Sequence, residues 1–106
     1  MSVKPQYLFI YKNNSAVDDL LDTSPFRYDK PISYRRGREQ SIIDYEHFTL
    51  KCIKKYEIND NLRGFKTWQI LIEGCLYDNI TQRQRDEILI PLMCPYSILG
   101  GRVVRI

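Results

Sequence analysis

The chain is almost devoid of alanine, with one Ala against thirteen Ile among 106 residues. Alanine is the strongest helix former and isoleucine favours strands, so this imbalance argues for a sheet with short helices rather than a helical bundle. A genome poor in G and C produces the same bias, because the codons for Ile, Lys, Asn and Tyr are AT-rich. Small proteins of viruses and mobile elements often have this composition, and we expect such an origin.

Long hydrophobic runs are also missing. No window approaches the roughly 18 uninterrupted apolar residues of a transmembrane helix, and the most apolar run, residues 88–94, is broken by Pro91. The N-terminal sequence MSVKPQ lacks the apolar segment of a signal peptide. These absences predict a cytoplasmic protein without membrane contact.

The chain has little excess of either charge. Its net charge is +3 and its pI is near 8.8, below the pI of about 9 that marks a nucleic-acid-binding domain by charge alone. The charge therefore permits nucleic acid as a partner without indicating it. Hydrophobic residues make up 43% and charged residues 27%, as in ordinary globular domains, and the length fits a single domain over residues 1–106.

Cysteine motifs and metal motifs are absent as well. Cys52, Cys75 and Cys94 are an odd number without CxxC spacing, which predicts free thiols rather than disulfides or a zinc site. The sequence contains no EF-hand spacing, no phosphate-binding loop and no convergent set of catalytic groups. We therefore expect no metal, no cofactor and no catalytic residue.

What the chain does have is a pair of alternating segments. Residues 45–58 and 65–77 flank the polar link NDNLRG and predict a long β-hairpin. Its apolar residues at even positions are Phe48, Leu50, Cys52, Tyr56, Ile58, Trp68, Ile70, Ile72 and Leu76. The expected fold is a small α+β domain with an antiparallel sheet centred on this hairpin and short helices packed on one face.

The register of this hairpin follows from its apolar positions. Both apolar sets share a face only if paired residue numbers add to an even sum. A sum of 124 pairs Tyr56 with Trp68, which is a favourable aromatic contact, and a sum of 122 is the alternative. Either sum points Cys52 and Cys75 to opposite faces and brings His47 close to Cys75.

The flanking segments predict shorter elements. Residues 6–12 are apolar on both faces, which indicates a strand that is covered on two sides or lies centrally in the sheet. Thr81 and Gln84 have the spacing of a capping box. The other expected elements are a helix over residues 16–22, a loop over 23–39 with an extended piece at 32–34, a turn at 41–43, a helix from 82 to about 90, and a last strand over 102–106.

The sequence YRRGRE in the long loop is the first candidate binding element. Its three arginines surround a glycine that lets the backbone approach an anion, and its tyrosine can stack on a base. Two arginines of the last strand extend this set if that strand lies nearby. The candidate residues for contacts with phosphates or with acidic side chains of a partner are Tyr34, Arg35, Arg36, Arg38, Arg102 and Arg105.

The second face of the hairpin is the other candidate surface. It is only half polar, because Ile53 and Leu71 lie among its charges. Such a face is either covered by the N-terminal segment or offered to a second copy or a partner protein. The candidate interface residues are Tyr45, His47, Lys51, Ile53, Leu71 and Glu73.

Three functions follow from these features, in descending order of support. The first is a non-enzymatic interaction protein, an accessory or inhibitory protein that docks on a host protein or complex. The second is a nucleic-acid-binding module that uses the arginine-rich residues 34–39. The third is a thiol-dependent enzyme in which His47 activates Cys75 and Glu73 orients the imidazole.

Overall fold

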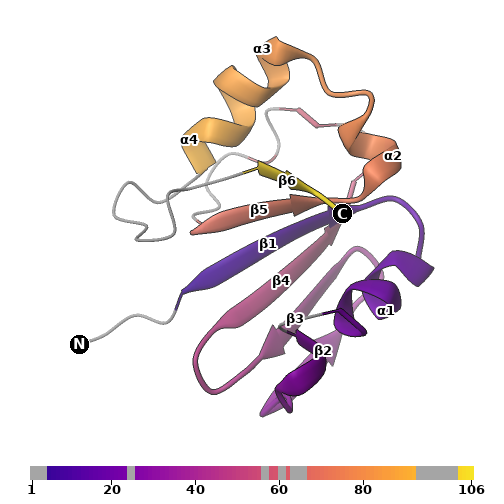
Figure 1. Cartoon of the computed structure of the whole chain (residues 1–106), viewed down its shortest axis with the longest axis vertical. Helices are drawn as coiled ribbons and strands as arrows, with labels where there is room; N and C mark the ends of the chain where they lie inside the picture. The colour runs from indigo at the N-terminus through magenta and orange to yellow at the C-terminus, as the bar shows by residue number, and fades with distance from the viewer. Residues whose placement is uncertain (1–4, 24–25, 56–57, 60–61, 63–66, 93–102) are drawn as a thin grey trace.

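The fold is one mixed six-stranded sheet in the order β2-β3-β4-β1-β5-β6 (Figure 1). The computed structural model describes residues 5–23, 26–55, 58–59, 62, 67–92 and 103–106. The strands are β1 (Gln6–Tyr11), β2 (Ser33–Arg36), β3 (Gln40–Asp44), β4 (Thr49–Lys54), β5 (Gln69–Ile72) and β6 (Val103–Arg105). β1 runs parallel to β4 and β5, β5 runs parallel to β6, and β3 is antiparallel to both β2 and β4.

β1 is the central strand of the parallel part of this sheet. Its residues 8–11 are buried on both faces, so their apolar side chains stabilise two separate cores. This arrangement confirms the expectation that the N-terminal strand is covered on two sides or lies centrally in the sheet. The chain folds as a small α+β domain, as expected.

The expected hairpin of residues 45–58 and 65–77 is wrong, because β1 lies between β4 and β5. Phe9 pairs with Cys52 on one side and with Leu71 on the other. Two parallel strands need a crossover connection instead of a short turn, and of the described residues between β4 and β5, Ile58 and Leu62 are buried in the core. Alternation reports which side chains share a face, but it does not report which strand is the neighbour.

The parity rule fails together with the hairpin. Cys52 and Leu71 share one face of the sheet, whereas Ile53 and Ile70 share the other. The even positions of the two strands therefore point in opposite directions. Tyr56, and with it the expected aromatic pair, lies outside the described residues.

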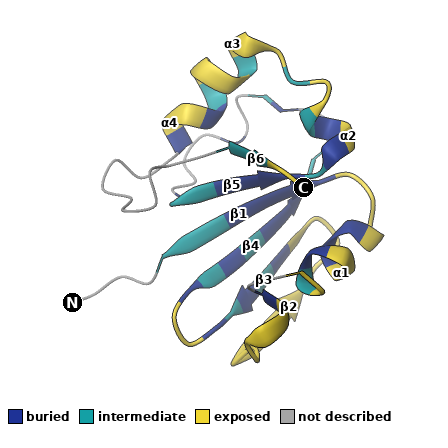
Figure 2. Ribbon diagram, in the orientation of Figure 1, coloured by how far each residue is buried: buried dark blue, intermediate teal, exposed yellow. Residues whose placement is uncertain are grey.

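Helices cover both faces of the sheet rather than one (Figure 2). On one side, called the α1 face, α1 (Ser15–Leu21) and the short 3-10 helix η1 (Phe26–Tyr28) are packed through buried residues such as Val17 and Leu20. On the other side, called the α2 face, α2 (Gly74–Tyr77), α3 (Gln82–Gln84), the π-helical turn η3 (Arg85–Leu89) and α4 (Ile90–Leu92) are packed. The earlier expectation of helices on one face is therefore corrected.

The capping box at the start of α3 is confirmed. Thr81 Oγ1 accepts a hydrogen bond from the Gln84 N–H at 3.1 Å, and Gln84 Oε1 accepts one from the Thr81 N–H at 3.0 Å. Helical structure then continues through Pro91 to Leu92. Within the described ranges, no helix is long and apolar enough to cross a membrane.

Residues 23–39 are more structured than the expected loop. They include η1 and β2, and β2 extends the expected piece at residues 32–34 as far as Arg36. Residues 41–43, expected as a turn, lie inside β3. The basic segment therefore belongs to a β-hairpin formed by β2 and β3, which is the outer edge of the sheet.

Candidate functional site

The basic residues of the sequence lie on β2 and on the turn that follows it. Tyr34, Arg35 and Arg36 belong to β2, all of whose residues are exposed, and Arg38 lies in the turn to β3. Gly37 closes the hairpin by donating its N–H to the Gln40 carbonyl at 2.9 Å. A Cβ at Gly37 would lie 2.6 Å from that carbonyl oxygen, so the turn requires glycine.

The ladder between β2 and β3 determines which backbone groups face outward. Antiparallel pairs alternate between hydrogen-bonded and non-hydrogen-bonded, and the Gly37–Gln40 pair is hydrogen-bonded. The alternation along the register places the backbone N–H and C=O groups of Arg35 towards β3. The same groups of Tyr34 and Arg36 are directed away from β3. β2 is the last strand of the sheet, so these groups lie on an edge that no described strand occupies.

The side chains of β2 alternate between the two faces of the sheet. Arg36 pairs with Ser41, whose neighbour on β4 is Cys52 in the α1-face core. Arg35 pairs with Ile42, whose neighbour on β4 is Lys51. Arg36 therefore projects on the α1 face and Arg35 on the opposite one.

The arginines of this hairpin differ from those elsewhere in their ionic partners. Within the described part of the chain, the side chains of Arg35, Arg36 and Arg38 make no hydrogen bond or ion pair. By contrast, Arg83 Nε lies 2.9 Å from Glu87 Oε2, and Arg105 is paired as described below. Charges without an internal partner are available to an external one.

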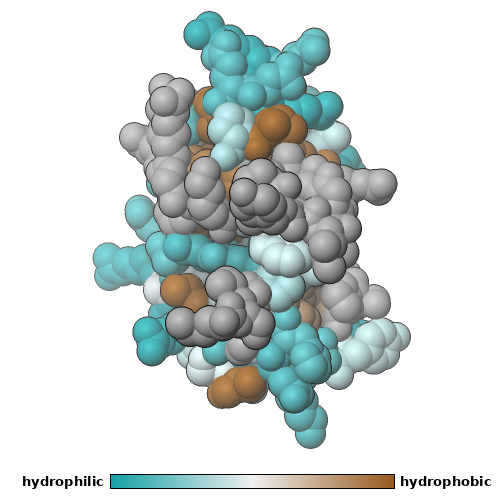
Figure 3. All heavy atoms as spheres, turned by 90° about the vertical axis from the view of Figure 1, so that its left-hand side faces the viewer, coloured by the Kyte–Doolittle hydropathy of each residue, from teal (hydrophilic) through white to brown (hydrophobic). Residues whose placement is uncertain are grey.

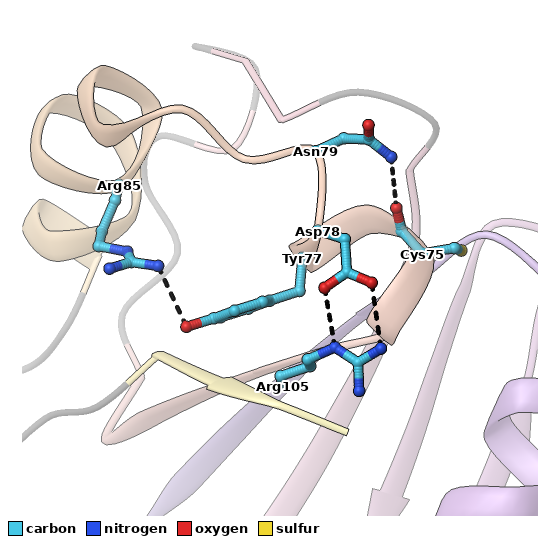
Figure 4. Close-up of polar contacts among 6 residues, drawn as sticks. All are labelled: Cys75, Tyr77, Asp78, Asn79, Arg85 and Arg105. Carbon is cyan, nitrogen blue, oxygen red and sulfur yellow. Dashed lines mark hydrogen bonds and ion pairs between the residues drawn. The ribbon is translucent and has the colours of Figure 1, made fainter.

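The structure does not bring Arg105 to this set. β6 is the opposite edge of the sheet from β2, and the Arg105 guanidinium donates two hydrogen bonds to the Asp78 carboxylate at 2.9 and 3.1 Å (Figure 4). The hydrogen bond from Arg105 holds the pKa of Asp78 below its usual value. Arg102 lies outside the described residues.

The contacts around Arg105 attach the last strand to the helices. Arg85 Nη2 donates to the Tyr77 hydroxyl at 3.1 Å, and its guanidinium carbon lies 5.5 Å from the centre of that ring (Figure 4). A Cβ at Gly74 would lie 2.9 Å from Arg105 Nη2. This cluster is a structural one that joins β6, α2 and η3.

A polar hollow opens between the β2–β3 turn and the start of α1. Its volume is about 450 Å³. The Lys54 ammonium group, at the end of β4, donates to Asn14 Oδ1 at 2.8 Å. We call this feature the basic hollow, and its lining residues are Tyr11, Asn14, Val17, Arg36, Gly37, Arg38, Glu39, Ser41 and Lys54.

Three of the expected interface residues lie in the protein interior. Tyr45, Ile53 and Leu71 are 1%, 3% and 8% exposed, and the Tyr45 ring stacks on Phe48 with centroids 4.5 Å apart. Partial burial also lowers the pKa of Lys51. The half-polar face expected from the sequence therefore does not exist as a surface, because its residues divide between the two sides of the sheet: Tyr45 and Leu71 lie in the α1-face core and Ile53 in the α2-face core.

His47 and Cys75 lie at opposite ends of the parallel strands. His47 precedes β4, with its Nε2 3.9 Å from the Glu46 carboxylate and its side chain 80% exposed. Cys75 follows β5 in α2. The length of β1, six residues or roughly 20 Å, separates these two ends, so the structure contradicts the expected thiol–imidazole contact.

Glu73 is engaged by the chain that leaves β1 instead of by a histidine. Its Oε1 accepts hydrogen bonds from the N–H groups of Lys12 and Asn13 at 2.8 and 2.9 Å, and its Oε2 accepts one from Asn13 Nδ2 at 2.6 Å. Burial alone would raise the pKa of Glu73, but these hydrogen bonds and one with Cys75 outweigh it and lower that pKa. Glu73 therefore fixes the adjacent ends of β1 and β5.

Sequence reasoning missed the basic hollow and the contacts of Glu73. Both depend on the parallel arrangement of β1 with its neighbours, which places residues 12–14 beside Lys54 and Glu73. The only local signal was the pair Asn13–Asn14 directly after an apolar strand. No group of His, Cys, Asp and Glu side chains suited to a metal ion occurs among the described residues.

Figure 3 views the molecule from the side at the amino ends of the parallel strands, where the described hydrophobic residues show as small patches among hydrophilic ones. Two large hydrophobic residues are exposed at β2, namely Tyr34 within the strand at 40% and Ile32 directly before it at 65%. The hairpin edge is therefore the place where exposed aromatic, aliphatic and arginine side chains coincide.

Comparisons with protein-family models, with curated protein sequences and with solved structures each gave no match for this chain.

Proposed function

We propose that this protein is a non-enzymatic interaction module that docks on a partner protein by strand addition to β2. The observation that carries this proposal is the open outer edge of β2, where Tyr34 and Arg36 direct their backbone N–H and C=O groups away from β3. A partner strand that pairs with such an edge gains main-chain hydrogen bonds. Nucleic acid has no backbone that could satisfy this ladder.

The partner strand is acidic. Arg35, Arg36 and Arg38 have no ionic partner among the described residues, and charge-assisted hydrogen bonds to carboxylates are stronger than neutral ones. Tyr and Arg are also the side chains that dominate binding energy at protein interfaces. Pairing of β2 with a second copy of itself would place arginines opposite arginines in the registers centred on Arg35 or Arg36, and like charges at such positions destabilise a sheet.

The biological role that fits this mode is that of an accessory or inhibitory protein. Strand addition occupies an edge of the partner and so blocks whatever that edge normally binds. The composition typical of viral and mobile-element proteins supports a host protein as the partner.

Strand addition is tested by titrating the protein with a short peptide that alternates Glu and Thr. Tyr34→Pro removes an outward N–H without removing a bond to β3, and proline is tolerated at such edge positions. Tyr34→Ala is the matched control, because it removes the same side chain and keeps the N–H. We expect Tyr34→Pro to bind the peptide at least several-fold more weakly than Tyr34→Ala. Equal affinity of the two variants would contradict strand addition.

Nucleic acid is the second candidate function, favoured by the same arginines, which have no ionic partner in the described ranges, next to the exposed Tyr34 ring. Replacing Arg35, Arg36 and Arg38 together by Ala should then weaken binding of every oligonucleotide sequence and flatten the salt dependence. A salt series with single-stranded and duplex oligonucleotides measures both effects. Absence of binding at low salt would eliminate this candidate.

A further inference from the structure

The basic hollow lies where α/β sheets commonly hold ligands. β1 and β4 are adjacent and parallel, and their last residues, Tyr11 and Lys54, both line the hollow. After β1 the chain passes to the α1 face, whereas after β4 it passes to the α2 face, where Ile58 and Leu62 are buried. A divergence of this kind leaves a crevice beyond the carboxyl ends of the strands.

The lining of this crevice is cationic. Among the described residues that line it, Arg36, Arg38 and Lys54 contribute three positive charges and Glu39 one negative charge, an excess of two. Arg36 reaches the hollow from the α1 face of β2. Burial raises the pKa of the Tyr11 phenol, and the positive charge of Arg36 is close enough to oppose that rise. The cations therefore converge on one volume from two strands and a turn.

The hollow also has a fixed shape and a suitable size. Lys54 is held from two sides, because its N–H donates to the Glu39 carbonyl at 2.7 Å and its ammonium donates to Asn14 at 2.8 Å. The Tyr11 ring and Val17 add an apolar wall to the polar one. A volume of about 450 Å³ falls in the range of small-ligand pockets and far exceeds a lone inorganic anion.

From this arrangement we propose that the basic hollow binds a phosphate monoester, with the dianionic phosphate between Arg36, Arg38 and Lys54 and the esterified group against Tyr11 and Val17. The excess of two positive charges matches a phosphate dianion, which carries nearly two negative charges at neutral pH. The site shares Arg36 and Arg38 with the docking edge, whereas Tyr11, Asn14 and Lys54 belong to the hollow alone, which opens on the α1 face and not along the outer edge of β2.

Calorimetric titration with adenosine monophosphate, adenosine and inorganic phosphate tests this proposal. We expect adenosine monophosphate to bind most tightly and adenosine not to bind measurably. Lowering the pH below about 6 removes one phosphate charge and should weaken binding. Equal binding of adenosine and its monophosphate, or no binding of the monophosphate at millimolar concentration, would overturn the proposal.

Neighbouring arginines on opposite faces provide the matched variants. Arg36→Gln and Lys54→Gln should each weaken binding of adenosine monophosphate by roughly ten-fold or more, because each removes a charge-assisted contact. Arg35→Gln makes the same charge change one residue away on the other face and should leave the affinity within about two-fold. An equal loss in Arg35→Gln and Arg36→Gln would mean non-specific attraction and would refute the site.

The two proposals fail separately. Tyr34→Pro changes the docking edge and none of the residues that line the hollow, so it should weaken peptide binding at least several-fold and retain nucleotide binding. Lys54→Gln should have the reverse effect. NMR spectra of the backbone amides verify that each variant is folded before its affinities for the peptide and for adenosine monophosphate are compared.

Discussion

Replacing Cys52 with alanine should change how the stability of this protein depends on alkaline pH. Cys52 is fully buried in the α1-face core, and burial raises the pKa of its thiol from 9.0 to about 12. Between these values the unfolded chain releases the thiol proton while the folded protein keeps it. The folded state then binds more protons, so the free energy of unfolding decreases as the pH rises through this window.

The size of this decrease follows from the pKa difference. One pH unit above the unfolded pKa corresponds to about 1.4 kcal/mol, so the thiol should cost the wild type about 1.4 kcal/mol between neutral pH and about pH 10. Burial also raises the pKa values of Tyr7, Tyr11 and Tyr45. The wild type and Cys52→Ala share these phenols, so the difference in stability between the two proteins isolates the contribution of the thiol.

Urea unfolding of the wild type and of Cys52→Ala at several pH values measures the effect. At neutral pH the variant should be less stable by about 1 kcal/mol because it leaves a small cavity. This deficit should disappear by about pH 10, since only the wild type carries the buried thiol. Cys75→Ala controls for loss of an exposed sulfur. A stability difference between Cys52→Ala and the wild type that stays constant from neutral to alkaline pH would refute the burial of the Cys52 thiol in the folded state.

Three further predictions concern the contacts that hold the fold. Glu73→Gln should destabilise the protein at neutral pH. The difference in stability from the wild type should shrink as the pH falls below 4.5, because a lowered carboxyl pKa stabilises the folded state only while Glu73 is ionised. Acid titration followed by circular dichroism measures this difference. Gly37→Ala should cost about 1–3 kcal/mol, because its Cβ would force the Gln40 backbone to move, whereas Arg38→Ala on the same turn should change the urea midpoint little. Leu89→Ala should cost about 2–5 kcal/mol because Leu89 is fully buried, while Ile90→Ala, at a position 45% exposed, should cost less than half as much in the same assay.

Part of this fold could be predicted from the sequence. The apolar character of residues 6–12 on both faces indicated a central strand, and the spacing of Thr81 and Gln84 indicated a helix start, because both are local properties. The partners of β4 and β5 were not predictable in this way. Alternation looks the same whether the neighbour follows after a turn or is a distant strand inserted between them.

One signal against the hairpin was present in the sequence. Ile53 and Leu71 sat on the face that was expected to be polar, and apolar residues on both faces are typical of strands with helices on each side. The basic residues of β2 were found from composition alone. Their arrangement around a hollow was not, because Lys54 and Asn14 reach it only through the pairing of β4 with β1.

The most direct test of docking at β2 is amide hydrogen exchange of residues 33–36 with and without the alternating Glu–Thr peptide. In the free protein the Arg35 amide should exchange slowly and the Tyr34 and Arg36 amides rapidly, because of these three amides only that of Arg35 is directed towards β3. Addition of the peptide should slow exchange at Tyr34 and Arg36 and leave Arg35 unchanged. Bound peptide without protection of Tyr34 and Arg36 would contradict strand addition as the function of this edge.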